Sequence, residues 1–307
     1  MQQSARGGLL TVAKVFGALL LLLILLYAAY SVYVSQRYGQ HLPFTKLNVD
    51  GVEREYALFT PSSNSATPLP LVILLNGGSA GRWRFPQQRQ WQQWASEVGF
   101  VLAIPLGRRL AHNEGAWQLD TQPNSMQDIA YIDAMIEQIG GDQRLDSRRI
   151  YAVGYSLGSM FSYELICHMG DRFAAVASFA GTMPVTPKAC SPAQPVALLH
   201  AHGVQDEIIA YANSWDWKQW PSVGTMQDIP SLIAFWGERY QCQQQNTVKQ
   251  AGETHIVQSQ CDQDVVVEHY RLDPGTHEWP ATLAGSPTYK TLWSFLSRHA
   301  KSATSEK

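Results

Sequence analysis

The segment GYSLG at 154–158 places Ser156 between two glycines, a spacing that suits a serine nucleophile on a tight turn. Glycine makes up about 7% of an average chain, so this pattern arises by chance in roughly one chain in ten of this length. It predicts a nucleophile only if a strand enters the turn and a helix leaves it. The alternative is a helix N-cap serine that performs no chemistry.

A nucleophilic serine needs a base, and the base needs a carboxylate that orients it. After a serine on such a turn, these partners follow in the order Asp or Glu, then His. Asp206 follows the predicted strand 196–203, and His277 lies in PGTHEWP, after the predicted strand 265–273. We therefore expect Ser156, Asp206 and His277 to form a catalytic triad. Glu207, next to Asp206, is the alternative acid.

The other histidines have ordinary structural explanations. Four of them lie in or beside predicted strands, and one lies at a predicted helix end, where a cation is favoured in any case. These residues are His200, His202, His255, His269 and His168.

Two backbone N–H groups near the serine are needed to stabilise an oxyanion. The first expected donor is Leu157, at the start of the predicted helix. The second belongs to NGGSAG at 76–81, where Gly77 and Gly78 let the backbone approach a ligand closely. We expect the Gly78 N–H as donor, with Ser79 as the alternative. A phosphate-binding loop is disfavoured because no G-x-x-x-x-G-K-[ST] pattern follows.

These residues fall at the ends of predicted elements. Short apolar runs alternate with helical patterns, which indicates a mostly parallel sheet with helices on both faces. Since ligands bind beyond the carboxyl ends of parallel strands, the candidate residues share one edge. Expected strands are a hairpin in 46–61, then 71–75, 100–105, 148–155, 173–181, 196–203 and 265–273; expected helices are 87–99, 125–141, 156–169 and 286–299.

The N-terminal segment 15–34 carries no charge, and about 20 apolar residues span a hydrocarbon core. Basic residues precede this segment and are expected to stay inside, so the part that follows is exported. We favour an uncleaved signal anchor over 1–35, a polar stalk over 36–45 and one catalytic domain over 46–307. A cleaved signal peptide, with secretion of the domain, is the alternative, although its apolar region is usually only about 7–15 residues long.

Four cysteines in a chain expected to leave the cytosol predict two disulfides. Sequence proximity favours Cys167–Cys190 and Cys242–Cys261, and four free thiols are the alternative. No Cys-x-x-Cys is present and no histidine lies at ligand spacing, so we expect no metal and no cofactor. The formal net charge is −2, with no block of like charges, which disfavours nucleic acid as a partner.

The ordered combination of motifs resembles a known group of enzymes. The resemblance is carried by YAVGYSLGSM, FAAVASFAG, HAHGVQDEIIAY, PGTHEWP and the pair Cys242 and Cys261. Over about residues 46–300 the chain is similar to extracellular polyhydroxybutyrate depolymerases and feruloyl esterases, the carbohydrate esterase family 1 branch of the α/β-hydrolases. The resemblance implies an α/β-hydrolase fold and a serine esterase with the triad named above.

Other positions match or depart from the pattern of that group. The family's oxyanion loop matches Gly77-Gly78, and Asp128, Tyr131 and Trp279-Pro280 also fit. The family commonly has His-Gly where this chain has Asn76-Gly77, and Gly-Gly where it has Gly158-Ser159. Neither change removes a catalytic group, and both are expected to reshape the floor of the pocket.

The segment 204–240 is long for a connection and is a possible lid or insertion. Its tryptophans Trp215, Trp217 and Trp220 suit a cleft for an acyl or aromatic group or a sugar ring. They equally suit a small lid core or contact with the bilayer interface. Trp279 is a further candidate for contact with substrate. Four loop arginines are more readily explained as solvated than as an anion site: Arg82, Arg84, Arg108 and Arg109.

The sequence therefore predicts hydrolysis of a carboxylic ester through an acyl-enzyme on Ser156. A polyhydroxyalkanoate-like, feruloyl or acetyl ester is the expected substrate class. The same triad would also serve acyl transfer to a cell-envelope acceptor, or peptide cleavage of the prolyl oligopeptidase type. A non-catalytic, membrane-tethered binding protein on a hydrolase scaffold is disfavoured because all three triad residues are present. The oligomeric state stays open.

Overall fold

The computed structural model of the chain describes residues 2–38, 42–62, 67–78, 85–108, 117–119, 126–183, 190, 192, 194–212, 215–216, 225–250 and 252–302. The predicted site residues Ser79 and Trp217 lie outside this part of the chain, as do Trp220 and three of the four loop arginines.

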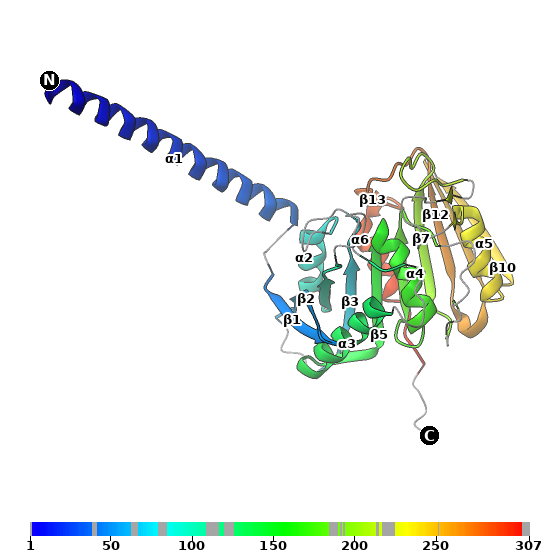
Figure 1. The fold of residues 1–307 in the computed structure, drawn as a ribbon. Helices are drawn as coiled ribbons and strands as arrows, with labels where there is room; N and C mark the ends of the chain where they lie inside the picture. Colours follow the sequence, from blue (N-terminus) through cyan, green and yellow to red (C-terminus); the bar gives the residue numbers. More distant parts are fainter. Residues whose placement is uncertain are drawn as a thin grey trace.

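A ten-stranded sheet forms the centre of the domain (Figure 1). Its strands are β1 (Phe44–Val49), β2 (Val52–Phe59), β3 (Leu69–Leu75), β4 (Val101–Pro105), β5 (Leu145–Tyr155), β6 (Ala175–Phe179), β7 (Ala197–Gly203), β10 (Gln244–Gln250), β11 (Glu253–Ser259) and β12 (Val267–Leu272). They lie in the order β1-β2-β4-β3-β5-β6-β7-β12-β11-β10. Neighbours from β4 to β12 pair in parallel, and the outer pairs are antiparallel. This confirms the predicted mostly parallel sheet.

Helices cover both faces of this sheet, as predicted. They are α2 (Gln88–Val98), α3 (Gln127–Asp142), α4 (Leu157–Met169), α5 (Ile229–Arg239) and α6 (Thr288–Leu296). On one face α2 packs against β4 and α6, and on the other face α3 packs beside α4. The central strands β4, β6 and β7 are buried along their whole length because both of their faces are covered.

Two parts of the fold escaped the sequence patterns. The edge strand β10 reads QQNTVKQ and is exposed throughout, so no apolar run indicates it. The other part is α5, which lies within the possible lid at 204–240. Its first turn is capped by Asp228, whose carboxylate accepts from the Ser231 N–H at 2.8 Å. Because α5 packs against β12 with Trp236 fully buried, residues 229–239 form part of the helical layer on the sheet.

Both disulfides lie at the ends of secondary structure elements. Cys167 of α4 is bonded to Cys190, and Cys242, just before β10, is bonded to Cys261, just after β11. These are the pairs that sequence proximity favours. The second bridge closes the base of the β10–β11 hairpin and so ties its two strands together.

The N-terminal helix α1 (Gln2–Tyr38) projects away from the domain (Figure 1). Its segment Lys14–Gln36 is long and apolar enough to cross a membrane by length and composition. The helix continues through Tyr38 and β1 begins at Phe44, so the expected stalk over 36–45 is shorter than predicted. Gln36 and Arg37 are good helix formers, which explains the extension. The apolar helix and the two disulfides fit an exported protein.

Candidate active site

Ser156 lies on a sharp turn between β5 and α4. Its φ of 54° and ψ of −120° are strained for a residue with a side chain. A Cβ on Gly154 would lie 2.4 Å from the carbonyl oxygen of Gly158, and one on Gly158 would lie 2.1 Å from that of Leu75. Only glycine fits at either position, so these two residues allow α4 to begin directly beside the end of β3. The strand before Ser156 and the helix after it are those that the sequence predicts.

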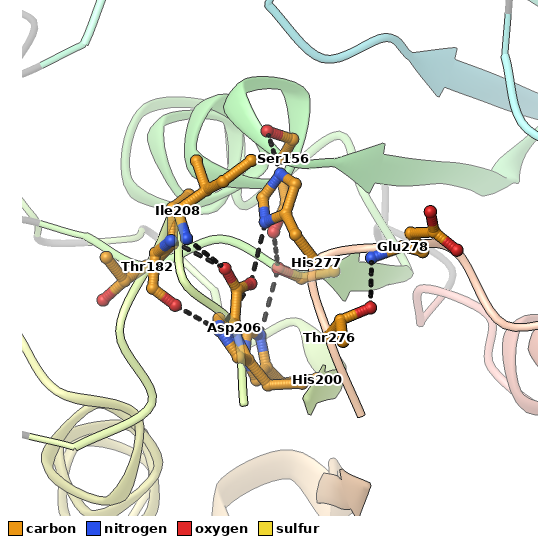
Figure 2. Close-up of polar contacts among 12 residues, drawn as sticks. Ser156, Thr182, His200, Asp206, Ile208, Thr276, His277 and Glu278 are labelled. Atoms are coloured by element: carbon orange, nitrogen blue, oxygen red, sulfur yellow. Dashed lines mark hydrogen bonds and ion pairs between the residues drawn. The ribbon is translucent and has the colours of Figure 1, made fainter. Parts of the chain in front are cut away.

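The Ser156 hydroxyl faces a histidine and does not cap the helix. It makes no side-chain capping hydrogen bond to α4, and its Oγ lies 2.9 Å from Nε2 of His277. Nδ1 of His277 lies 2.7 Å from Oδ2 of Asp206, so the three side chains form one continuous line (Figure 2). The structure thus brings the three predicted residues together. Asp206, and not the exposed Glu207, faces the imidazole.

The Asp206 carboxylate is buried, and both of its oxygens accept hydrogen bonds. Its Oδ1 accepts backbone N–H bonds from Ile208 at 2.9 Å and from Ile209 at 2.8 Å (Figure 2). Burial on its own would raise the pKa of this carboxyl. Hydrogen bonds from His202, from His277 and from the Ile209 amide outweigh burial and lower the pKa of Asp206 well below its usual range. Asp206 is therefore a carboxylate at neutral pH.

The loop that carries His277 is held by its neighbours. The N–H of Gln205 donates to the carbonyl of Gly275 at 2.7 Å, which joins the loop after β7 to the loop after β12. The hydroxyl of Tyr155 donates to the carbonyl of His277 at 3.1 Å. Burial and nearby carboxylates raise the pKa of Tyr155, so its hydroxyl stays a neutral donor. Tyr155, the residue before Ser156, therefore holds the loop that carries His277.

The glycine loop after β3 lies against Ser156. A Cβ on Gly77 would lie 3.0 Å from the Cβ of Ser156, so a side chain there would require Ser156 to shift. The carbonyl of Asn76 accepts a hydrogen bond from the indole N–H of Trp117 at 2.8 Å. Trp117 is stacked on Phe161 of α4, with ring centroids 4.8 Å apart. Gly78 follows at the end of this described segment, and Leu157 is the first residue of α4.

A buried ion pair supports the segment that carries Trp117. Asp128 of α3 lies 2.7 Å from Arg54, and its other oxygen accepts from the Gln118 N–H at 2.7 Å. The guanidinium of Arg54 also lies over the ring of Tyr131. Asp128 and Tyr131, the two positions that fit the pattern of the resembled family, therefore stabilise the segment that carries Trp117. Arg54 and Trp117 were not predicted, because nothing local in the sequence indicates such distant contacts.

Trp279 forms part of an aromatic cluster that includes Tyr155, the residue before Ser156. Its ring centroid lies 5.2 Å from that of Phe179, 5.3 Å from that of Phe85 and 5.9 Å from that of Tyr155. The indole N–H donates to Oε1 of Gln87 at 3.1 Å. Trp279 is half-buried and held in place, so it shapes the surroundings of Ser156.

The remaining candidates are placed as follows. The backbone of Trp215 pairs with Met226 in the short strands β8 (Trp215–Asp216) and β9 (Thr225–Met226). Arg108 lies 3.9 Å from Asp128, near the ion pair of Arg54. Among the described residues, no group of three His, Cys, Asp or Glu side chains is arranged to hold a metal ion.

The sheet order, the helices on both faces and the turn at Ser156 define an α/β-hydrolase fold. A sequence model of the family described as "Esterase PHB depolymerase" matches residues 54–227, more than half of the chain, and the chain belongs to this family.

Solved structures support the fold. The acetyl xylan esterase from Aspergillus awamori superposes with a TM-score of 0.61 at 12% identity, covering 83% of this chain and 99% of that one. A thermostable esterase superposes with a TM-score of 0.54 at 16% identity, covering 85% of this chain and 63% of that one.

Curated relatives are also named as esterases. The bifunctional acetylxylan esterase/xylanase XynS20E of Neocallimastix patriciarum is 23% identical over 81% of this chain. A probable feruloyl esterase C of Aspergillus oryzae is 27% identical over 52% of this chain. The chain covers 34% of the first relative and 57% of the second, so it spans between a third and about half of their length.

Proposed function

We propose that the protein is a serine esterase that hydrolyses a carboxylic ester through an acyl-enzyme on Ser156. The observation that carries this proposal is the hydrogen-bonded line from Ser156 through His277 to Asp206, on a strained turn, in a chain of an esterase family. Because Ser156, His277 and Asp206 are all present and hydrogen-bonded, the arrangement also argues against a purely binding role.

The geometry supports a two-step mechanism. Nε2 of His277 accepts the Ser156 proton as Oγ attacks the ester carbonyl, and the N–H groups of Leu157 and Gly78 hold the oxyanion. The imidazolium then gives the proton to the departing alcohol. In the second step His277 removes a proton from water as the water oxygen attacks the acyl-enzyme. The imidazolium then returns this proton to Oγ of Ser156 as the carboxylic acid leaves. Throughout, Asp206 accepts from Nδ1–H and so keeps Nε2 free to act as the base.

The acyl group belongs to the short aliphatic or aromatic class. The half-buried rings of Tyr155 and Trp279, packed on the buried Phe85 and Phe179, provide apolar surface near Ser156. Relatives are named for acetylxylan and feruloyl esters. A panel of p-nitrophenyl esters of increasing chain length together with methyl ferulate tests both activity and class. Turnover of at least one is expected, whereas activity on none would contradict the esterase proposal. Product analysis with added alcohols separates hydrolysis from acyl transfer.

Trp117→Phe is expected to lower kcat by about 5- to 30-fold with little change in KM, since one hydrogen bond contributes about 1–2 kcal/mol. The phenyl ring keeps the stack on Phe161 but leaves the Asn76 carbonyl without its donor, which loosens the loop that carries Gly78. The control is Trp91→Phe, because Trp91 is also buried and its indole N–H has no acceptor among the described residues. A Trp117 variant with reduced stability but unchanged kcat would contradict the role of this loop.

We further propose that α1 is retained as an uncleaved anchor and holds the catalytic domain at the outer surface of a membrane. The apolar segment Lys14–Gln36 is longer than the apolar region of about 7–15 residues in a cleaved signal peptide. The intact mass of protein isolated from the membrane fraction is expected to include residues 1–35. A mature form that begins after this segment would show that the helix is a cleaved signal.

A further inference from the structure

Three buried histidines lie beneath Asp206, on two adjacent strands. His200 and His202 belong to β7 and His269 to β12, and their exposed fractions are 0%, 0% and 2%. Buried imidazoles need partners for both ring nitrogens, because an unpaired polar group is costly away from water. The partners of these rings therefore report which nitrogen carries each proton.

His202 contacts the carboxylate that faces the base. Its Nε2 lies 3.2 Å from Oδ2 of Asp206 and 2.9 Å from the carbonyl oxygen of Ile209. A carbonyl oxygen only accepts, so Nε2 of His202 must carry a proton. That proton is shared with Oδ2 of Asp206, the oxygen that also accepts from His277.

The second nitrogen of His202 continues the network. Its Nδ1 lies 3.2 Å from Nε2 of His200. On the far side, Nδ1 of His200 lies 2.7 Å from the Tyr163 hydroxyl and 3.2 Å from the Ser178 hydroxyl. Both hydroxyls can donate to this nitrogen, which leaves the His200 proton on Nε2, where it donates to His202. Burial, with His202 and His269 nearby, lowers the pKa of His200 well below its usual value, so the ring is neutral.

The network reaches back to the helix of the nucleophile. The hydroxyls of Ser178 and Ser159 form a short hydrogen bond, and Ser159 lies in the first turn of α4, three residues after Ser156. Ser159 stands where the resembled family commonly has glycine. A single assignment of the protons is consistent with all of these contacts. In it each group donates a hydrogen bond to the next, in the order Ser159, Ser178, His200, His202 and Asp206.

We propose that His202 is a positioning residue for the reaction, in its neutral Nε2–H form, and that His200 holds it in that form. Figure 2 shows Asp206 with His277 on one side and His200 on the other. The backbone N–H groups hold Oδ1 of Asp206 and His202 holds Oδ2, so these contacts fix the plane of the carboxylate that faces His277. This inference rests on the proposed esterase function, through the role of Asp206.

Paired substitutions at His202 test the positioning role through kcat and KM. His202→Leu removes the donor and is expected to lower kcat on the order of 10²-fold with KM nearly unchanged, the effect of a misplaced catalytic group. His202→Gln places an amide N–H near the position of Nε2 and should restore most of that loss. His269→Gln is the control, since His269 is equally buried but its partners are Tyr211 and the carbonyl of His200. Its kcat should stay near that of the wild type, even if its Tm falls.

Two results would overturn the proposal. One is a His202→Leu enzyme with the kcat of the wild type, and the other is equal loss of kcat in His202→Leu and His269→Gln, which would indicate general destabilisation. If His202→Leu does not fold, the nitrogen NMR spectrum of the ¹⁵N-histidine-labelled wild type decides. We expect His202 to show a protonated Nε2 and an unprotonated Nδ1 at neutral pH, and the opposite tautomer or an imidazolium would overturn the assignment.

Labelling separates this inference from the esterase proposal. A wild-type enzyme whose Ser156 does not react with a fluorophosphonate contradicts the proposed function itself. A wild-type enzyme that reacts, with His202→Leu equally active, contradicts only the role of His202.

Discussion

Ser156→Ala is expected to lower kcat on p-nitrophenyl esters by about 10⁵- to 10⁶-fold, because removing a serine nucleophile leaves only binding and oxyanion stabilisation. The substitution deletes the Oγ that lies 2.9 Å from Nε2 of His277 and leaves the turn unchanged. Because the backbone conformation at this residue is strained with either side chain, the Tm should change little. Steady-state kinetics and a thermal melt on the same preparation measure both quantities.

The control for Ser156→Ala is Ser162→Ala. Ser162 is buried on the same helix, and its hydroxyl donates to the carbonyl of Ser159 at 2.6 Å, away from the reacting atoms. Its kcat should remain within about twofold of the wild type, since a single local hydrogen bond contributes about 1 kcal/mol to stability rather than to the reaction. A Ser156→Ala enzyme within tenfold of wild-type activity would mean that another residue is the nucleophile.

Asp206→Asn is the second large expected effect, a loss in kcat on the order of 10⁴-fold with KM little changed. The amide of Asn can keep the backbone bonds at one oxygen position and present an NH₂ group to His277. Nδ1 of His277 would then accept, and its proton would move to Nε2, which faces Ser156. In that tautomer Nε2 has no free lone pair to take the serine proton. Single-turnover kinetics at saturating ester isolates this loss in the acylation step.

Glu207→Gln is the matched control, because Glu207 is the neighbouring carboxylate and is exposed. It should retain wild-type kcat. If Glu207→Gln were the inactive variant and Asp206→Asn the active one, the orienting acid would have been assigned to the wrong residue.

Asp206 also links stability to pH. Its pKa is lowered in the folded state, so its carboxylate stabilises the fold above the ordinary aspartate pKa of about 3.9. That contribution decreases as the pH falls from there through the lower pKa of the folded state. The difference in Tm between wild type and Asp206→Asn should therefore be constant near neutrality and shrink below about pH 4.

The parts of the fold that the sequence predicts are those with strong local patterns. The buried strands β3 and β4 are continuous apolar runs, and β6 and β7 are mostly apolar. The turn at Ser156 requires glycine at positions 154 and 158 for steric reasons. The expected positions of Asp206 and His277 follow from topology, since both lie just after parallel strands that pair with each other. Chain order and the ends of strands are visible in the sequence.

The residues that hold the site in place from other parts of the chain cannot be recognised from such local patterns. Trp117 and Asn76 are 41 residues apart, and Arg54 and Asp128 are 74 apart, so their contacts depend on tertiary packing alone. The strand β10 is polar and exposed, which hides it from any hydrophobic pattern. His202 could be recognised as buried from its strand, but not as a partner of Asp206, because that contact depends on the turn after β7.

The most direct test of the central claim is covalent labelling with a fluorophosphonate followed by mass spectrometry of the modified peptide. An activated serine reacts because its base removes the proton during attack on phosphorus. We expect one adduct, on Ser156, at neutral pH, with labelling lost in Ser156→Ala and strongly slowed in Asp206→Asn. An unlabelled wild type, or an adduct on a different serine, would contradict the assignment of Ser156 as the nucleophile.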